Sequence, residues 1–552
     1  MKIASILLTA LLSAGNLLAQ EAAPVSPAAM KNWQDARFGM FIHWGPVSLK
    51  GTEIGWSRGA QVPIEEYDNL YKQFNPTKFN ADEWVAIAKA AGMKYIVLTT
   101  KHHDGFCLWD TKQTDHNIMN TPFKRDVVKE LAAACKKGGI AFGAYYSTCD
   151  WHHPDFPLTS PGGSVERATS NLDRYTDYLK AQTKELLTNY GPLFTIWYDV
   201  PQKFDAVRGA GVINMARAIQ PSIVINNRTG DRGDYDTPEQ VIGGFQINRP
   251  WETCMTICEQ WAWKPDDTMK SLKDCVQTLI RSNGGDGNLL FNVGPMPTGE
   301  IEARQVVRLK EMGAWVSKNS TAIYGTRGGP LKPTAHMVST RKGDKIYLHL
   351  LEKEDGPVTI PVLPNTIKAA KLLNGPNIKL VLADGTIEFK IPDGSWDPID
   401  TIVELTVDGD AMTMAPLNPL RKGNLVGAKA SASAFYENDA KYSPDMILDG
   451  QADSRWAAPL GTAPSWLQID FAKETTFKGI KIEEAIFEVA SRVQKFELQK
   501  KDGDTWTTFF TGTDIGPKFS TTFAPITTRA IRLNILAATN GPTISEISIQ
   551  TP

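Results

Sequence analysis

The 552-residue sequence lacks several features that would point to particular classes of protein. Beyond the first residues, no stretch approaches the roughly 20 consecutive apolar residues that a membrane-spanning helix needs. Lys and Arg number 59 against 61 Asp and Glu, for a formal net charge of −2. This balance gives no electrostatic attraction toward nucleic acid or an anionic membrane. We therefore expect neutral partners, no nucleic acid and no membrane span.

Cysteine and histidine are also scarce. The six cysteines all lie between residues 107 and 275, and none forms a CxxC pair. We expect buried free thiols, because this spacing indicates neither a disulfide framework nor a zinc site. The eight histidines are unevenly placed: six come before residue 154, and four of those form two adjacent pairs.

Residues 1–19 have the pattern of a secretory signal peptide. Lys2 supplies the positive start, residues 6–12 supply a short apolar segment, and small residues precede Gln20. The segment is too short for a membrane span and contains no cysteine that could carry a lipid. We expect a secreted or periplasmic protein.

From residue 28 to 330, short apolar runs alternate with helix-like segments, such as 82–91 after the good capping residue Asn80. The predicted strands lie at 38–44, 95–100, 141–146, 193–199, 223–227 and 289–293. This alternation predicts an α/β fold, a (β/α)8-like TIM barrel. A doubly wound sheet shares the alternation, but no Gly-rich phosphate fingerprint follows the first strand.

Two β-rich units follow the predicted barrel. Residues 331–415 hold short β-like runs separated by Gly, Pro, Asn and Asp, which predict a small antiparallel β-sandwich. A linker-like segment, 408–421, leads to a second predicted β-sandwich at 422–552.

Each predicted barrel strand ends in polar or aromatic residues, and the carboxyl ends of barrel strands meet at one rim that carries the chemistry. Asp199 ends one of these strands, directly after Trp197 and Tyr198. Alone, such an Asp is more often a loop or capping residue. Aromatic faces beside a carboxylate, with histidines and an arginine on other strands, are typical of a sugar site.

Glycoside hydrolysis usually needs a second carboxyl group to protonate the leaving oxygen. Spacing alone does not choose among the downstream candidates, which are Asp231, Asp234, Asp236, Glu239, Glu252 and Glu259. The histidine pairs could also suggest a two-metal hydrolase. Adjacent strand residues point to opposite faces, however, and no HxH or HxxxH is present, so we expect no metal in the catalytic domain.

Eight short motifs occur in order between residues 43 and 295: HWG from 43, KHHDGF from 101, YYS from 145, DWHHP from 150, WYD from 197, NNR from 226, WETC from 251 and NVGP from 292. From about residue 30 to 330 the chain thereby resembles the α-L-fucosidases of glycoside hydrolase family 29. The resemblance implies a retaining, exo-acting enzyme that needs no cofactor and removes terminal α-L-fucosyl residues from an oligosaccharide or glycoconjugate.

The same resemblance implies roles for individual residues. Asp199 would be the nucleophile and Glu239 the acid/base, with Glu252 as the second candidate for that role. The implied substrate contacts are His43, Trp56, His102, His103, Tyr146, Trp197, Arg228 and Trp261. Neutral imidazoles can donate to and accept from ring hydroxyls, while Trp56 and Trp261 would receive the C5 methyl group.

Two departures from the family pattern leave the leaving-group preference open. Gly55-Trp56 stands where many relatives carry Glu-Trp, and Trp261-Ala262-Trp263 replaces the usual Trp-Gly-Tyr. Two alternatives also remain: an α-L-galactosidase-like enzyme, and an inactive fucosyl-glycan-binding protein, against which the presence of both carboxylates argues. The linkage cut, the glycan source and the oligomeric state are not predicted.

The C-terminal unit carries motifs at 443–450, 453–456 and 466–471 that resemble a discoidin-like (coagulation factor type C) domain, a type common among carbohydrate-binding modules of family 32. The resemblance implies a structural calcium ion, with the acidic loop from Asp445 to Asp453 as its candidate site. We expect Trp456 and Trp466 to be core aromatics, and whether this domain binds sugar is left open.

Overall fold

The computed structural model describes residues 22, 24–160, 163, 166–242, 244–353, 356–383, 386–419, 425, 427–450, 454–461, 464–485 and 491–551. The predicted signal peptide, residues 1–19, lies outside the described residues. Within the described part of the chain, no helix is both long enough and apolar enough to cross a membrane.

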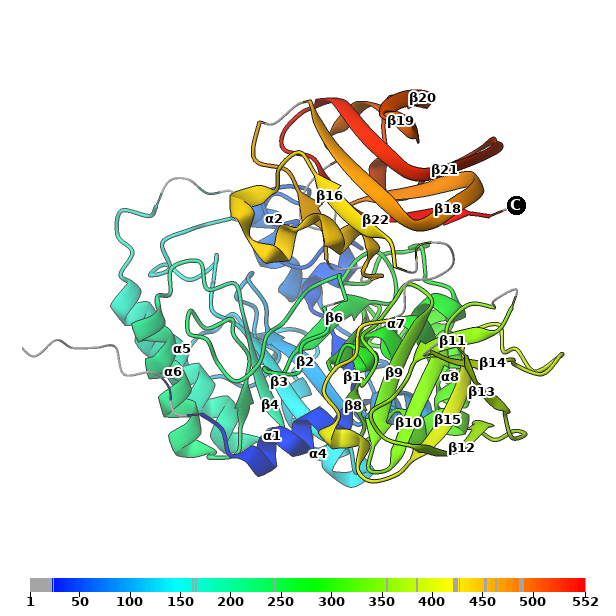
Figure 1. The fold of residues 1–552 in the computed structure, drawn as a ribbon. Helices are drawn as coiled ribbons and strands as arrows, with labels where there is room; N and C mark the ends of the chain where they lie inside the picture. Colours follow the sequence, from blue (N-terminus) through cyan, green and yellow to red (C-terminus); the bar gives the residue numbers. More distant parts are fainter. Residues whose placement is uncertain are drawn as a thin grey trace, which may run out of the picture.

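A curled parallel sheet forms the centre of the first unit (Figure 1). Its order is β5-β4-β3-β2-β1-β7-β6. Its strands are β1 (Phe38–Ile42), β2 (Tyr95–Lys101), β3 (Ala141–Ser147), β4 (Thr195–Asp199), β5 (Val224–Ile225), β6 (Glu252–Thr256) and β7 (Asn288–Val293).

The segment 235–239 closes this sheet into a barrel. Parallel bridges join Asn226 to Tyr235 on one side and pair Asp236 with Trp251 and Glu239 with Cys254 on the other. The segment therefore occupies the eighth position between β5 and β6, and the predicted (β/α)8-like fold is confirmed.

Helices surround the barrel: α1 (Pro27–Ala36), α2 (Ile64–Asn69), α3 (Ala81–Ala90), α4 (Val127–Gly138), α5 (Leu172–Asn189), α6 (Ala206–Ile219), α7 (Leu272–Gly284) and α8 (Ala303–Asn319). Helix α3 confirms the prediction at 82–91, because the Asn80 side chain caps it by accepting from the Glu83 N–H at 3.2 Å. Ser271 and Asp274 form a capping box at the start of α7.

Alternation along the strands divides their side chains between two cores. Inside the barrel, one residue set packs together: Phe41, Tyr95, Val97, Tyr145, Trp197, Val224, Tyr235, Cys254 and Leu290. Their strand neighbours, such as Ile96, Tyr146 and Tyr198, join the larger core under the helices. All six cysteines are free and buried, as predicted.

The second unit is an antiparallel sandwich beside α7 and α8 (green to yellow in Figure 1). Its five-stranded sheet contains β8 (Arg327–Gly328), β9 (Met337–Lys342), β10 (Lys345–Leu350), β12 (Ile367–Leu372) and β15 (Thr401–Val407). Its three-stranded sheet contains β11 (Val358–Pro361), β13 (Leu380–Ala383) and β14 (Thr386–Phe389). Gln277 of α7 donates to the carbonyls of Leu351 and Ile399, which ties the sandwich to the barrel.

The C-terminal unit is a second antiparallel β structure with its own core (orange to red in Figure 1). Its strands are β16 (Lys429–Ala432), β17 (Trp456–Ala457), β18 (Ser465–Glu484), β19 (Val493–Asp502), β20 (Thr505–Gly512), β21 (Phe519–Ala538) and β22 (Thr543–Gln550). Trp456 is fully buried, as expected.

Trp466 departs from that expectation. It alternates with the core residues Leu467 and Ile469, so it lies half-buried on the outward face of β18, where the Arg532 guanidinium stacks on its ring at 4.3 Å.

Candidate active site

The carboxyl ends of the barrel strands bring the polar residues of distant motifs together. His43 follows β1, His102 and His103 follow β2, and Asp199 ends β4. Arg228 follows β5, and Glu239 ends the closing segment. We name this group of residues the rim cup.

Three side chains surround the carboxylate of Asp199. Its Oδ2 accepts from the Tyr145 hydroxyl at 2.8 Å, and its Oδ1 accepts from Arg228 Nη1 at 2.8 Å. The Nε2 atom of His103 lies 3.7 Å from Oδ2. Burial alone would raise the pKa of Asp199, but the charge of Arg228 and the hydrogen bonds from Arg228 and Tyr145 outweigh it and hold that pKa below its usual value. The carboxylate is therefore ionised at neutral pH.

Arg228 joins Asp199 to Glu239. The same Nη1 atom that contacts Asp199 also lies 2.7 Å from Glu239 Oε2. Two further bonds, to the Thr237 hydroxyl and carbonyl, fix the guanidinium, and its carbon lies 4.8 Å from the centre of the Trp197 ring. The arginine is thus oriented on every side by groups of the closing segment and β4.

The two carboxyl groups consequently face one small space. Both oxygens contact a single nitrogen at 2.8 and 2.7 Å, so their separation cannot exceed the sum of those distances. That upper limit on the distance between the two oxygens is compatible with the separation of about 5–5.5 Å in retaining glycosidases and is shorter than the spacing of inverting ones. Asp199 is the more buried of the two, whereas the Glu239 side chain is 41% exposed.

Glu252, the alternative acid/base, lies inside the barrel. It is fully buried, accepts from the Trp197 indole N–H at 3.2 Å, and accepts from the Tyr95 hydroxyl. Burial raises the pKa of Glu252 to about 7. Its partners belong to the barrel interior, whereas Glu239 shares Arg228 with Asp199.

The other candidate carboxylates have different surroundings. Asp234 pairs with Arg217 and Asp236 pairs with Arg249. Asp231 accepts from a backbone N–H in its own turn, and Glu259 is exposed. Of the six carboxylates considered from the sequence, the structure joins Glu239 to Asp199 through Arg228.

Three histidines line the opposite side of the rim cup. His43 Nδ1 lies 2.7 Å from Asn292 Oδ1, and His103 Nδ1 lies 2.7 Å from Ser147 Oγ. The His102 ring stacks on Tyr145 and contacts His103. Burial lowers the pKa of His43 to about 3 and that of His103 to about 4, and it also lowers the pKa of His102 well below its usual value. All three imidazoles are therefore neutral at neutral pH.

Tyr146 does not join this group. Its ring packs under the helices, its hydroxyl donates to Gln182 of α5 at 2.7 Å, and Lys101 lies over its face. The structure thus contradicts a sugar contact from Tyr146, because alternation turns it outward. The neighbouring Tyr145 occupies the predicted place and reaches Asp199.

The predicted tryptophans occupy different depths. Trp197 is almost fully buried beneath Arg228. Trp261 lies against His43, with 4.8 Å between ring centres, and Trp56 is 43% exposed with its ring edge-on to His103. Trp261 and Trp56 can supply apolar surface to a ligand, whereas Trp197 mainly packs its ring against the Arg228 guanidinium.

Sequence reasoning missed the role of Glu53. Its carboxylate accepts from the backbone N–H groups of Ile54, Trp261 and Ala262, which fastens the loop after β6 to the loop after β1. The sequence places Tyr145, Ser147 and Asn292 in the YYS and NVGP motifs but does not indicate what they contact. Both faces of a barrel strand are buried, so no polar side marks which residue points inward.

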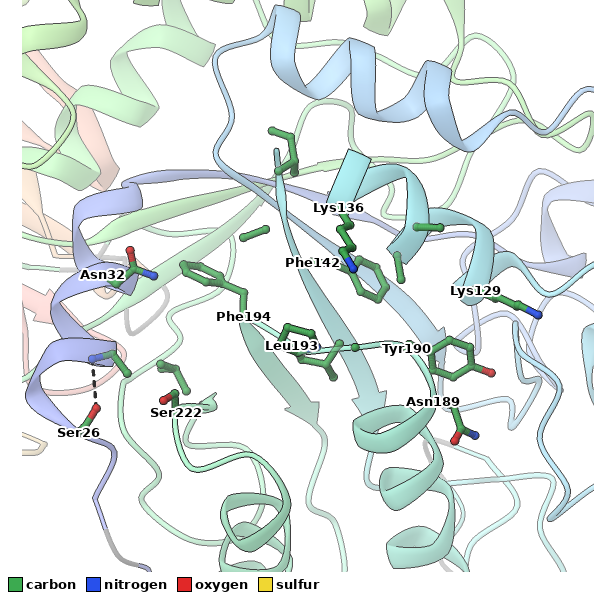
Figure 2. Close-up of a pocket in the computed structure, with 18 of the residues that line it drawn as sticks. Ser26, Asn32, Lys129, Lys136, Phe142, Asn189, Tyr190, Leu193, Phe194 and Ser222 are labelled. Atoms are coloured by element: carbon green, nitrogen blue, oxygen red, sulfur yellow. Dashed lines mark hydrogen bonds between the residues drawn. The ribbon is translucent and has the colours of Figure 1, made fainter. Parts of the chain in front are cut away.

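A large cavity of the described structure lies away from the rim cup. It has a volume of about 870 Å³ and is lined by α1, α4 and the segments that begin β3 and β4 (Figure 2). These are the amino ends of the strands, opposite the rim cup. Its described lining, including Phe142, Leu193 and Phe194, contains no carboxylate or histidine, so it lacks the chemistry found at the rim.

Comparisons with known proteins agree with the geometry. Residues 14–321 match the alpha-L-fucosidase family, and residues 428–548 match the F5/8 type C domain. Human plasma alpha-L-fucosidase is 33% identical over 329 residues, which cover 53% of this chain and 69% of that protein.

Two solved structures extend the comparison. Alpha-L-fucosidase isoenzyme 1 from Paenibacillus thiaminolyticus is 34% identical with a TM-score of 0.64, covering 69% of this chain and 99% of that one. A fucosidase from Bacteroides thetaiotaomicron, trapped as a covalent intermediate with 2-fluoro-fucosyl fluoride, is 27% identical with a TM-score of 0.64, covering 70% of this chain and 99% of that one. On this evidence from sequence, fold and site, the chain belongs to the alpha-L-fucosidase family of retaining glycoside hydrolases.

Proposed function

We propose that this chain hydrolyses terminal α-L-fucosyl residues by double displacement, with Asp199 as nucleophile and Glu239 as acid/base. Asp199 attacks C1 while Glu239 protonates the departing oxygen, which gives a fucosyl ester on Asp199. Glu239 then takes a proton from water, and the water attacks C1 to release fucose with its configuration retained. The observation that carries this assignment is the single Arg228 nitrogen shared by both carboxylates.

Arg228 also supports the change of role that Glu239 must make. In the free enzyme the charge of Asp199 offsets the guanidinium beside Glu239. Esterification removes that negative charge, while Glu239 keeps its contact with the guanidinium. Glu239 is then placed to take the proton of the attacking water in the second step.

A leaving-group comparison tests the assignment of Glu239. Glu239→Ala should slow release of a poor leaving group by about 10²–10⁴-fold, while an activated aryl fucoside should lose far less in its first step. Glu259→Ala, which removes an exposed carboxylate near the loop after β6, is the control and should slow neither substrate. Equal slowing of both substrates by Glu239→Ala would move the acid/base role to Glu252.

Preference for fucose over L-galactose is part of the proposal. Trp56 and Trp261 provide apolar surface at the rim cup, which suits a methyl group better than a hydroxymethyl group. Matched aryl fucosides and α-L-galactosides should differ in kcat/KM by about 10–200-fold. Equal turnover would favour the galactosidase alternative, and no turnover of either would favour the inactive binding protein.

We propose in addition that the C-terminal domain binds glycan on the outward face that carries Trp466. Arg532 lies between two indoles, 4.3 Å from the Trp466 ring and 4.1 Å from the Trp506 ring. Gln468 accepts from Arg532 at 2.8 Å and donates to Asp470. Half-buried aromatic rings beside amides and carboxylates suit neutral, hydroxyl-rich ligands.

We also propose that calcium stabilises this domain. Ser454 donates to Asp449 at 2.7 Å and the Gly450 N–H donates to Glu546 at 3.2 Å, so two carboxylates approach one loop. Asp453 lies outside the described residues, and the described ones contain no cluster of three or more His, Cys, Asp or Glu suited to a metal. Backbone carbonyls would therefore complete the ligand set. A chelator should lower the Tm of this domain, and an unchanged Tm would contradict the proposal.

Export is the remaining proposal, supported by the pattern of residues 1–19. The mature protein should begin near Gln20 when it is isolated from the medium or periplasm and sequenced from its amino end. A protein that retains Met1 and stays in the cytoplasm would contradict it.

A further inference from the structure

We propose that Asn292 and Ser147 fix the proton positions on two imidazoles, so that His43 and His103 accept hydrogen bonds from sugar hydroxyls while His102 donates one. The inference rests on the proposed function only in taking a sugar as the occupant of the rim cup. Asn292 and Ser147 are positioning residues in this scheme, because they act through the imidazoles. The three rings then select hydroxyls by direction as well as by place.

The proton on His43 is assigned by Asn292. The Asn292 amide nitrogen lies 2.8 Å from the carbonyl oxygen of Trp261, which can only accept. The amide must therefore turn its NH₂ group toward Trp261 and its oxygen toward His43, 2.7 Å from Nδ1. That oxygen is an acceptor, so Nδ1 carries the proton. In a neutral ring Nε2 is then a bare acceptor.

The proton on His103 is assigned by Ser147. A serine hydroxyl has one hydrogen, and Ser147 Oγ lies 2.8 Å from the carbonyl oxygen of Cys149. Because that carbonyl cannot donate, the hydroxyl hydrogen points to it. Ser147 Oγ then accepts from His103 Nδ1 at 2.7 Å, which leaves Nε2 of His103 as an acceptor.

With these proton positions, a ligand group beside Asp199 has to be a hydrogen-bond donor. The Nε2 atom of His103 faces Asp199 Oδ2 at 3.7 Å, and both atoms are acceptors. A donor hydrogen between or beside them relieves the repulsion. A sugar hydroxyl that donates there satisfies the site, whereas an ether or fluorine at the same place does not.

His102 has the opposite arrangement. Its Nδ1 is buried and is without a hydrogen-bond partner in the described structure. Gly55 covers this edge: a Cβ placed on Gly55, which has φ of +66°, would lie 2.8 Å from that nitrogen. A buried N–H without an acceptor is the costlier of the two unpaired states. The proton therefore resides on Nε2, and His102 donates.

Histidine NMR on the free, full-length enzyme tests the proton positions directly. With eight histidines, ¹⁵N-histidine labelling gives a small spectrum, and two-bond ¹⁵N–¹H correlations distinguish protonated from bare ring nitrogens. We expect Nδ1–H on His43 and His103 and Nε2–H on His102. A bare Nδ1 on His43 or His103, or a bare Nε2 on His102, would overturn the proposal. The measurement needs no turnover, so it stands apart from failure of the proposed function.

Ligand binding tests the consequence. Ser147→Ala should make the His103 signals report a changed or mixed tautomer and weaken L-fucose binding about 3–10-fold. Ser282→Ala is the control, because Ser282 is equally buried but donates to a helix carbonyl in α7. Unchanged His103 signals in Ser147→Ala would refute the positioning role, even if the variant were less stable.

Fluorinated sugars read the direction of each bond, since fluorine cannot donate. The affinities of monofluoro and deoxy L-fucoses are compared at each hydroxyl position. At the hydroxyls that donate to His43 and His103, the fluoro and deoxy analogues should bind equally weakly. At the hydroxyl that accepts from His102, the fluoro analogue should recover part of the affinity that the deoxy analogue loses. Recovery at every position, or at none, would contradict the assigned pattern.

Discussion

Arg228 is the residue that makes two separate motifs into one site. Its single Nη1 atom contacts both Asp199 and Glu239, and Thr237 and Trp197 hold it in place. A guanidinium is suited to this role because it stays charged and presents several donors in a fixed plane. Lysine could neutralise the pair but would not hold the same geometry.

Removing the guanidinium should change the acid side of the pH profile. The pKa of Asp199 is lowered because the Arg228 charge and the hydrogen bonds from Arg228 and Tyr145 outweigh burial, so the ionised nucleophile persists as pH falls below the usual value of 3.8. In Arg228→Met burial is less opposed, the pKa rises, and the acid limb of kcat/KM moves to higher pH. At neutral pH kcat/KM should also fall, by roughly 10²-fold or more.

Arg217→Met is the matched control, since Arg217 pairs with Asp234 outside the rim cup. Its acid limb should coincide with that of the parent enzyme. An unshifted limb in Arg228→Met would show that the guanidinium does not hold Asp199 ionised.

At the level of elements, strand β4 shows what the sequence could predict. An apolar run ending in Trp197-Tyr198-Asp199 predicted a strand with a carboxylate at the barrel rim, and the structure has that arrangement. Strand β3 shows what could not be predicted. Both Tyr145 and Tyr146 are fully buried, so burial pattern and residue type do not distinguish the inward ring from the outward one.

An irregularity in the pairing of β2 with β3 was also not predictable from the sequence. Pairing with β3 shifts between Thr99 and Lys101, so Lys101 packs outward over Tyr146 while His102 reaches the rim cup. A bulge of this kind re-aims side chains without a sequence signal. The prediction that Trp466 lies in the core was wrong. An aromatic residue next to core residues in the sequence can point to the opposite face of the strand.

Glu252 at the start of β6 provides a stability prediction. Its pKa is about 7 in the folded protein against 4.5 for an ordinary Glu, because it is buried. The folded state therefore binds the proton more tightly, and the stability that this proton contributes is lost as pH rises from about 4.5 through about 7. Glu252→Gln keeps a neutral group at this position at both pH values. Its free energy of unfolding, measured relative to that of the parent protein, should therefore be about 3 kcal/mol higher at pH 8 than at pH 4.5.

Urea denaturation followed by tryptophan fluorescence at the two pH values measures this difference. Glu259→Gln, an exposed site, should track the parent at both pH values. If Glu252→Gln showed the same offset from the parent at pH 4.5 and pH 8, Glu252 would not be the buried acid described here.

At the scale of the whole molecule, we assign catalysis and the proposed non-covalent binding of glycan to different units. The rim cup belongs to the barrel, and the outward face with Trp466 and Arg532 belongs to the C-terminal domain. The two domains have separate cores, although the C-terminal domain also meets the barrel and the sandwich at a cleft lined in part by Arg281, His336 and Lys481.

Trp466→Ala in the full chain should therefore separate binding from turnover. Loss of one stacking ring should weaken retention on immobilised mucin glycan by about 2–10-fold, with kcat/KM for an aryl fucoside unchanged. Leu460→Ala, at an exposed position of the same domain, is the control. Undiminished retention in Trp466→Ala would place glycan binding elsewhere.

Covalent trapping tests the central claim, that Asp199 is the nucleophile of a retaining fucosidase, most directly. With 2-fluoro-fucosyl fluoride, the fluoride leaves readily while the fluorine at C2 slows hydrolysis of the ester, so the intermediate should accumulate. We expect peptide mass spectrometry to locate one fluorofucosyl group on the peptide that contains Asp199, with fragment ions assigning it to that residue. A fluorofucosyl group on another carboxylate, or an active enzyme that never becomes labelled, would contradict the account.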